Sequence, residues 1–171
     1  WGSHERTDAA GRATFILPLP RVGRAKVQVL ARRPPSAPED HWIWLASAQN
    51  VAGHVYLQRV FSLPDGARGG TLWVAVDDSA VVYLNGVKVA EKGGWQQNAG
   101  IAVPAELFRR GENVVSVEAV NGTGPAGLLL RLTADTASGE VLVVTNDEWR
   151  AFAQKPAGWP ASAATGGEKA G

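Results

Sequence analysis

Short runs of Val, Leu, Ile and aromatic residues alternate with Gly and Pro along most of the chain. This punctuation is typical of antiparallel strands joined by turns, and signals for helices are nearly absent. Many short strands at regular spacing predict an all-β sandwich or barrel. The predicted strands are Ala13–Leu19, Ala25–Ala31, Trp42–Ala46, Val55–Leu63, Thr71–Asp77, Ala80–Leu84, Val87–Ala90, Asn113–Val120, Gly127–Thr133 and Val141–Thr145.

The clearest local pattern is a tight hairpin over residues 81–89. Two runs rich in Val meet at Asn85-Gly86, and both central residues of a type I′ turn need a positive φ, which Asn and Gly tolerate. In the predicted strand Asn113–Val120, apolar residues alternate with Ser116 and Glu118, so one face points inward and the other outward. Residues 104–108 are long enough for a single helical turn only.

Two segments fall outside this pattern. Residues 1–38 hold a predicted N-terminal hairpin arm and a Pro-rich linker, and two strands alone have no core. The arm must therefore pack on the sandwich, on a domain missing from this chain or on a neighbouring molecule. Residues 156–171 are rich in Ala, Gly and Pro, which predicts a linker or a disordered end. The sandwich itself is expected over residues 39–155.

Composition narrows the class of partner. The 171 residues carry a formal charge of +1, so no overall field favours a nucleic acid or an anionic membrane. No run approaches the length that inserts in a bilayer. Cys is absent, which excludes disulfides and Cys-ligated zinc. Met is also absent, so we expect a processed product or a piece of a longer polypeptide.

Catalytic patterns are missing from the sequence. We find no nucleophile elbow and no phosphate-binding loop, and the three histidines, His4, His41 and His54, lack the spacing of a metal site. The chain is therefore predicted not to be an enzyme.

Several ordered motifs over residues 42–149 resemble a known family. They are Trp42-Ile43-Trp44, residues 55–64, Val74–Asp78 followed by residues 82–86, Gly93-Gly94-Trp95, residues 110–121 and residues 125–132. Together these resemble the galactose-binding-like jelly-roll modules that accompany bacterial α-L-rhamnosidases. The resemblance implies an antiparallel jelly-roll β-sandwich that binds carbohydrate, while residues 1–38 lie outside it.

In sugar-binding members of that family, an acidic pair, a loop Trp and an Asn at a strand end converge on sugar and calcium. By position, the resemblance implies Asp77, Asp78, Trp95 and Asn121 as ligand-binding residues, with Asp77 and Asp78 holding calcium. The family often has Asp-Asn where this chain has Asp77-Asp78. One alternative is therefore that this difference alters or abolishes the contact with sugar.

Each of these residues has a structural alternative. Asp77 and Asp78 suit an Asx-type turn as well as a calcium site, and Trp95 suits a core plug as well as a sugar platform. Asn121-Gly122-Thr123 also forms an N-glycosylation sequon. Core or packing roles are favoured for the Trp residues at strand-like positions, namely Trp42, Trp44, Trp73, Trp149 and Trp159.

Two functions follow from these patterns. The first is a non-catalytic, secreted or cell-surface module that binds a polysaccharide or other glycan, with weak and multivalent contacts. The second is a structural subunit of an extracellular filament or surface assembly, in which the N-terminal strands complete the sheet of another copy of the chain.

Overall fold

The computed structural model describes residues 12–19, 23–30, 40–96 and 99–171, and the chain divides into two units, Trp1–Ala37 and Pro38–Gly171. In the first unit, β1 (Arg12–Leu19) and β2 (Gly23–Leu30) form a two-stranded antiparallel sheet, which is the predicted hairpin. The predicted Pro-rich linker lies outside the described residues.

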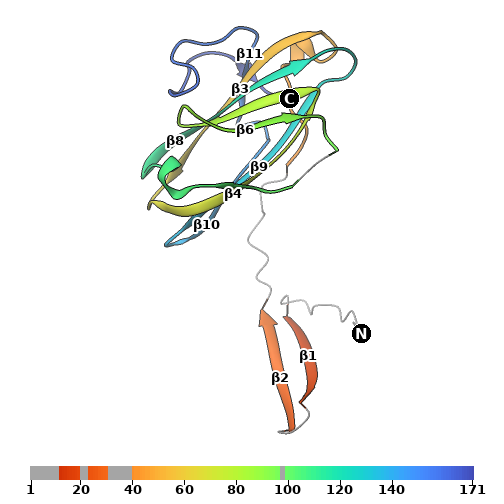
Figure 1. Cartoon of the computed structure of the whole chain (residues 1–171), viewed down its shortest axis with the longest axis vertical. Helices are drawn as coiled ribbons and strands as arrows, with labels where there is room; N and C mark the ends of the chain where they lie inside the picture. Colours follow the sequence, from red (N-terminus) through yellow and green to blue (C-terminus); the bar gives the residue numbers. More distant parts are fainter. Residues whose placement is uncertain (1–11, 20–22, 31–39, 97–98) are drawn as a thin grey trace. The chain divides into compact units, whose positions relative to one another are not determined.

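The second unit consists of two antiparallel sheets, so the predicted all-β sandwich is confirmed (Figure 1). The four-stranded sheet has the order β10 (Gly139–Val144), β9 (Gly127–Thr136), β4 (Ala67–Asp77), β7 (Ile101–Val103). The six-stranded sheet has the order β12 (Glu168–Lys169), β11 (Arg150–Phe152), β3 (Gly53–Leu63), β8 (Gly111–Asn121), β5 (Ser79–Leu84), β6 (Val87–Gly93). Short 3-10 turns cover Ala46–Ala48 and Ala105–Leu107, the second within the predicted helical turn. No helix among the described residues could span a bilayer.

The core lies between the two sheets and follows from strand alternation. On β4, the inward positions are Leu72, Val74 and Val76, all at most 2% exposed. The facing positions on the other sheet are equally apolar, for example Val115 and Val117 of β8. Burial of each such side chain contributes roughly 1.5–3 kcal/mol. Every second residue of these strands therefore points to the opposite, outer face of its sheet.

The Asn85-Gly86 turn has the predicted geometry, with φ values of 51° and 92°. The side chain of Asn85 does more than tolerate the turn, because it is buried and bonded. Its Nδ2 donates to Oδ1 of Asn113 at 2.8 Å, and its Oδ1 accepts from the backbone N–H of Val114 at 2.9 Å. These bonds attach the β5–β6 hairpin to the start of β8.

The prediction of a strand over Trp42–Ala46 is wrong, because this segment forms no regular strand. Only Ile43 forms a β-bridge, to Leu128. Beyond it the chain changes partner, because Trp44 exchanges both backbone hydrogen bonds with Gly171 at 3.0 and 3.2 Å. The 3-10 turn at Ala46–Ala48 then ends the extended segment.

Residues 156–171, predicted as a linker or disordered end, are also corrected by the structure. Trp159 packs edge-on against Tyr56 and Tyr83, with ring centroids 5.3 and 6.4 Å away. Farther on, β12 pairs with β11, and Ala170 is 2% exposed. The segment is therefore part of the sandwich.

Candidate functional site

The outer face of the four-stranded sheet carries a pocket of about 310 Å³, here called the Trp42 pocket. Its lining residues are Trp42, Asp77, Trp95, Pro125, Ala126 and Gly127. Asp77 ends β4 and lies opposite Gly127 of β9 in the ladder. Trp42 comes from the segment before the Ile43 bridge, and Trp95 follows β6. Four distant parts of the chain thus meet at one end of the sheet.

Two indoles at this pocket are open to solvent: Trp42 is 49% exposed and Trp95 56% exposed. For Trp42, the sequence favoured a packing role, and the structure places it at the surface instead. Gly127 explains its position, because a Cβ there would lie only 2.8 Å from Cε3 of Trp42. The glycine lets the indole lie against the strand, a relation that sequence patterns do not reveal.

Asp77 lines the Trp42 pocket with a perturbed carboxyl group. Partial burial raises its pKa, and the hydrogen bond and negative charge of the adjacent Asp78 raise it further. Two close carboxyl groups disfavour double ionisation, and a bound cation would relieve that repulsion. Asp77 thus offers the pocket a hydrogen-bonding group whose charge depends on pH.

Asp78 does not line the pocket, and its contacts are those of a turn residue. Its Oδ2 accepts the backbone N–H of Gly122 at 2.6 Å, and its carbonyl accepts the N–H of Gly94 at 2.6 Å. Its own N–H donates to Val120 at 2.9 Å. Asp78 therefore holds together the loops that follow β4, β6 and β8, the loops that surround the pocket.

Asn121 is 1% exposed and does not line the pocket either. Its Nδ2 donates to the carbonyls of Val51 and Gly124 at 3.3 and 3.2 Å. Its Oδ1 is buried without a hydrogen-bond partner. Burial of the amide nitrogen disfavours glycosylation of the folded chain, while the side-chain oxygen is left as an unused acceptor.

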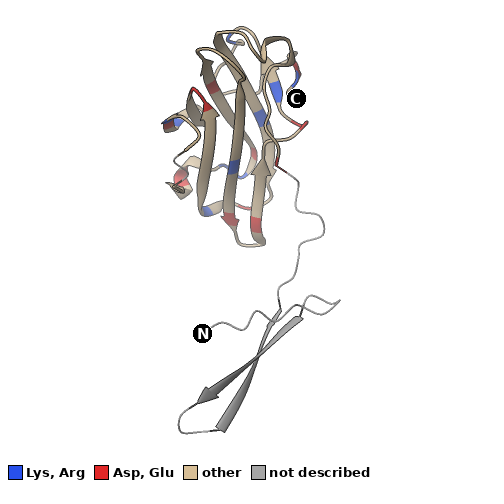
Figure 2. Ribbon diagram, turned by 90° about the vertical axis from the view of Figure 1, so that its right-hand side faces the viewer, with Lys and Arg blue, Asp and Glu red and all other residues tan. Residues whose placement is uncertain are grey.

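The remaining Trp residues divide between core and surface. Trp44 and Trp149 are at most 1% exposed, as predicted, and Nε1 of Trp149 donates to the carbonyl of Val144 at 2.8 Å. Trp159 packs on Tyr56, whereas Trp73 is half-buried on the outer face of β4. Among the described residues of the second unit, Lys, Arg, Asp and Glu are interspersed along the ribbon (Figure 2).

This chain is 30% identical over 150 residues to an α-L-rhamnosidase of Streptomyces avermitilis, covering 75% of this chain and 14% of the enzyme. A crystal structure of that organism's α-L-rhamnosidase complexed with L-rhamnose superposes with a TM-score of 0.69 over 77% of this chain and 14% of the enzyme. The chain is a β-sandwich module like one found within α-L-rhamnosidases. The resemblance predicted from the sequence is therefore confirmed.

Two further solved structures share the fold of the module. A lectin of Pleurotus ostreatus is 24% identical, with a TM-score of 0.68 over 77% of this chain and 40% of the lectin. A rhamnosidase of a Bacillus species is 20% identical, with a TM-score of 0.55 over 67% of this chain and 14% of the enzyme. No protein-family model matches the chain.

Proposed function

We propose that the module binds carbohydrate in the Trp42 pocket. The observation that carries the proposal is the pair of half-exposed indoles, Trp42 and Trp95, beside the carboxyl group of Asp77 in one pocket. Large aromatic residues exposed together mark binding sites rather than ordinary surface. An indole face packs against the C–H groups of a sugar ring, and a carboxyl group bonds its hydroxyls.

L-rhamnose and N-acetylgalactosamine (GalNAc) are the first sugars to test. The similar rhamnosidase structure is a complex with L-rhamnose, and one structure of the Pleurotus lectin is a complex with GalNAc. The rhamnosidase is the nearer of these two in sequence, at 30% against 20% identity. We therefore expect the module to bind L-rhamnose more tightly than GalNAc.

Calcium at this end of the sheet is part of the proposal. The donors are the Asp77 and Asp78 carboxyl groups, which are the oxygen ligands that Ca²⁺ prefers. They form a pair, and among the described residues no group of three or more acidic or His side chains is suited to a metal. Backbone carbonyls, water or the unpartnered Oδ1 of Asn121 would have to complete the shell.

Isothermal titration calorimetry with L-rhamnose and GalNAc, each with Ca²⁺ and with chelator, tests the function. We expect Trp42→Ala or Trp95→Ala to weaken binding at least tenfold, as truncation of an aromatic anchor does. Val87→Ala is the matched control, because Val87 is 49% exposed on β6 of the other sheet. The proposal fails if no saccharide binds, or if both Trp variants bind as the parent does.

Further parts of the proposed function concern the whole protein. We infer a non-catalytic module, supported by the match to only 14% of a rhamnosidase. A secreted or cell-surface location stays a prediction from the sequence. The alternative function, a filament subunit that uses its N-terminal strands, stays a prediction. Light scattering of the chain with and without residues 1–38 measures whether the arm drives association.

A further inference from the structure

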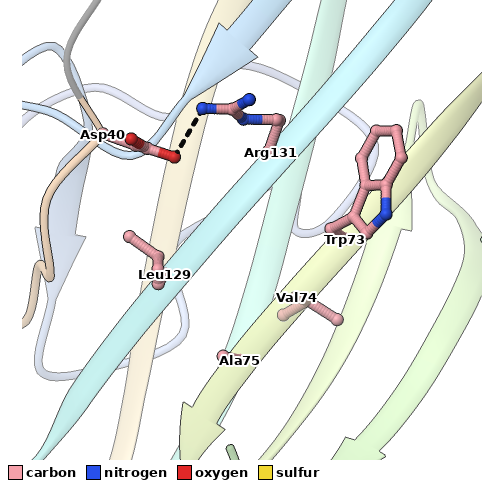
Figure 3. Close-up of a pocket in the computed structure, with 6 residues that line it drawn as sticks. All are labelled: Asp40, Trp73, Val74, Ala75, Leu129 and Arg131. Carbon is pink, nitrogen blue, oxygen red and sulfur yellow. Dashed lines mark hydrogen bonds and ion pairs between the residues drawn. The ribbon is translucent and has the colours of Figure 1, made fainter. Parts of the chain in front are cut away.

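A second pocket of about 310 Å³ lies on the same outer face as the Trp42 pocket. It is lined by Asp40, Trp73, Val74, Ala75, Leu129 and Arg131 (Figure 3). Ala75 and Trp73 are the next two outward positions on β4 after Asp77, and Leu129 and Arg131 are the corresponding positions on β9 after Gly127. The two pockets therefore adjoin along one pair of strands.

The register makes the path between the pockets continuous. Asp77 lies opposite Gly127, Ala75 opposite Leu129, and Trp73 opposite Arg131. Outward residues of a strand recur about every 7 Å, so Trp73 lies roughly 14 Å from Asp77 along β4. Between them the path runs over Ala75, a small residue that is 5% exposed, and Leu129 on the neighbouring strand. This length suits a chain of several sugar rings rather than one.

The far end of this path again combines an indole with polar side chains. Trp73 rises from β4 on one side, while Arg131 turns away toward Asp40 on the other (Figure 3). The Arg131–Asp40 pair, 2.9 Å apart, has side chains 46% and 33% exposed. Such a pair contributes little stability. It does hold a guanidinium group, with further N–H donors, in the pocket on the side away from the indole (Figure 3).

The position of Trp73 is supported from one edge. A Cβ at Gly100 would lie 3.0 Å from Nε1 of Trp73 and 2.9 Å from Cγ2 of Thr71. The glycine allows the chain to lie against the Nε1 edge of the ring. The indole is therefore held upright, and it is only half-buried.

We propose that the two pockets form one groove that binds an oligosaccharide: one sugar ring lies in the Trp42 pocket and the following rings run over Ala75 to Trp73 and Arg131. The inference rests on the proposed function and extends it to a substrate class. Because Asp40 neutralises the charge of Arg131, the groove suits uncharged sugars. The side chains of Asp40 and Arg131 can both form hydrogen bonds with sugar hydroxyls.

Calorimetry with L-rhamnose and with rhamnose di-, tri- and tetrasaccharides tests the groove. We expect affinity to rise with chain length, roughly tenfold from the monosaccharide to the tetrasaccharide. Trp73→Ala should remove that gain and leave L-rhamnose binding unchanged. Arg131 is exposed, so Arg131→Gln should leave the fold intact and remove part of the gain in affinity with chain length. Thermal unfolding of both variants verifies the fold, and Val87→Ala is again the control.

The outcomes separate the two proposals. If L-rhamnose binds through Trp42 and Trp95 but affinity is independent of chain length, the groove is refuted and the single pocket stands. If the length gain survives in Trp73→Ala and in Arg131→Gln, the groove is also refuted. If neither the monosaccharide nor any oligosaccharide binds, both proposals fail together. Tight binding of oligosaccharides alone, lost in Trp73→Ala, supports the groove.

Discussion

The two outer faces of the sandwich differ: one is covered by a segment of the chain and the other is open. On the six-stranded sheet, residues 156–164 lie over the outward positions of β3, β5 and β8. Gln58 donates to the carbonyl of Ser162 and accepts from the N–H of Ala164, at 2.9 and 2.7 Å. Ser116 donates to the carbonyl of Pro160 at 2.9 Å. On the four-stranded sheet, the outward positions of β4 and β9 line two open pockets instead.

The difference shows that one residue type can serve two purposes. Trp159 fills space between Tyr56 and Tyr83 on the covered face. Trp42 and Trp73 stand on the open face, in pockets that polar groups also line, Asp77 in one and Arg131 in the other. Composition cannot distinguish these uses. The covering segment decides which indoles stabilise the fold and which remain available to a ligand.

The largest expected contrast is between Trp159→Ala and Trp42→Ala in stability. Trp159→Ala should lower the free energy of unfolding by about 2–4 kcal/mol, somewhat less than for a fully buried Trp, because the ring is partly exposed. Trp42→Ala should stay within about 0.5 kcal/mol of the parent, as surface substitutions do. Urea denaturation measures both. Equal losses would show that the two faces do not differ as described.

A smaller effect is expected from Gly127→Ala, which acts on the open face alone. The new methyl group would meet Cε3 of Trp42 at 2.8 Å and displace the indole. We expect affinity for the pocket sugar to fall roughly tenfold, with thermal stability nearly unchanged. Gly66→Ala is the matched control, since a Cβ there meets no atom within 4 Å. Unchanged affinity in Gly127→Ala would show that the position of Trp42 does not matter for binding.

The smallest expected effect concerns pH. The pKa of Asp77 is raised by burial and by Asp78, so its carboxyl is protonated at a higher pH than an ordinary aspartate. Sugar or calcium affinity should therefore weaken as pH falls through that raised pKa. Stability changes in the opposite sense: the folded state holds the proton more tightly, so the free energy of unfolding falls as pH rises from the ordinary to the raised pKa.

Titrations and denaturation between about pH 3.5 and 7 measure both slopes. Asp77→Asn is the comparison, because it cannot ionise and should flatten each of them. A parent protein whose pH profile matches that of Asp77→Asn would contradict the assignment.

Much of the fold was predictable because it depends on near neighbours. The alternation in β8 placed Val115 and Val117 inward, and Asn85-Gly86 required a turn with positive φ. Strands of two or three residues, such as β7, β11 and β12, were missed because their length carries no periodic signal. The packing of residues 156–171 was missed for a related reason. A segment rich in Ala, Gly and Pro has no periodic pattern, and its place in the fold depends on contacts such as that of Trp159 with Tyr56.

The candidate site was predictable in part. Sequence motifs indicated Asp77 and Trp95, which the structure brings into one pocket. They also indicated Asp78, which the structure places in a supporting turn, and Asn121, which it places at the end of β8. Trp42 and Trp73 were expected to pack, since strand position alone does not say which outer face stays open.

The sequence by itself determined the alternation of each strand, the hairpin turn and the class of fold, because these follow from the conformational preferences of adjacent residues. The tertiary structure alone decided that Gly127 lies beneath Trp42 and that residues 156–164 cover one sheet and leave the other open. Those relations join segments far apart in the chain, and their physical basis is the fit between side chains rather than any local preference.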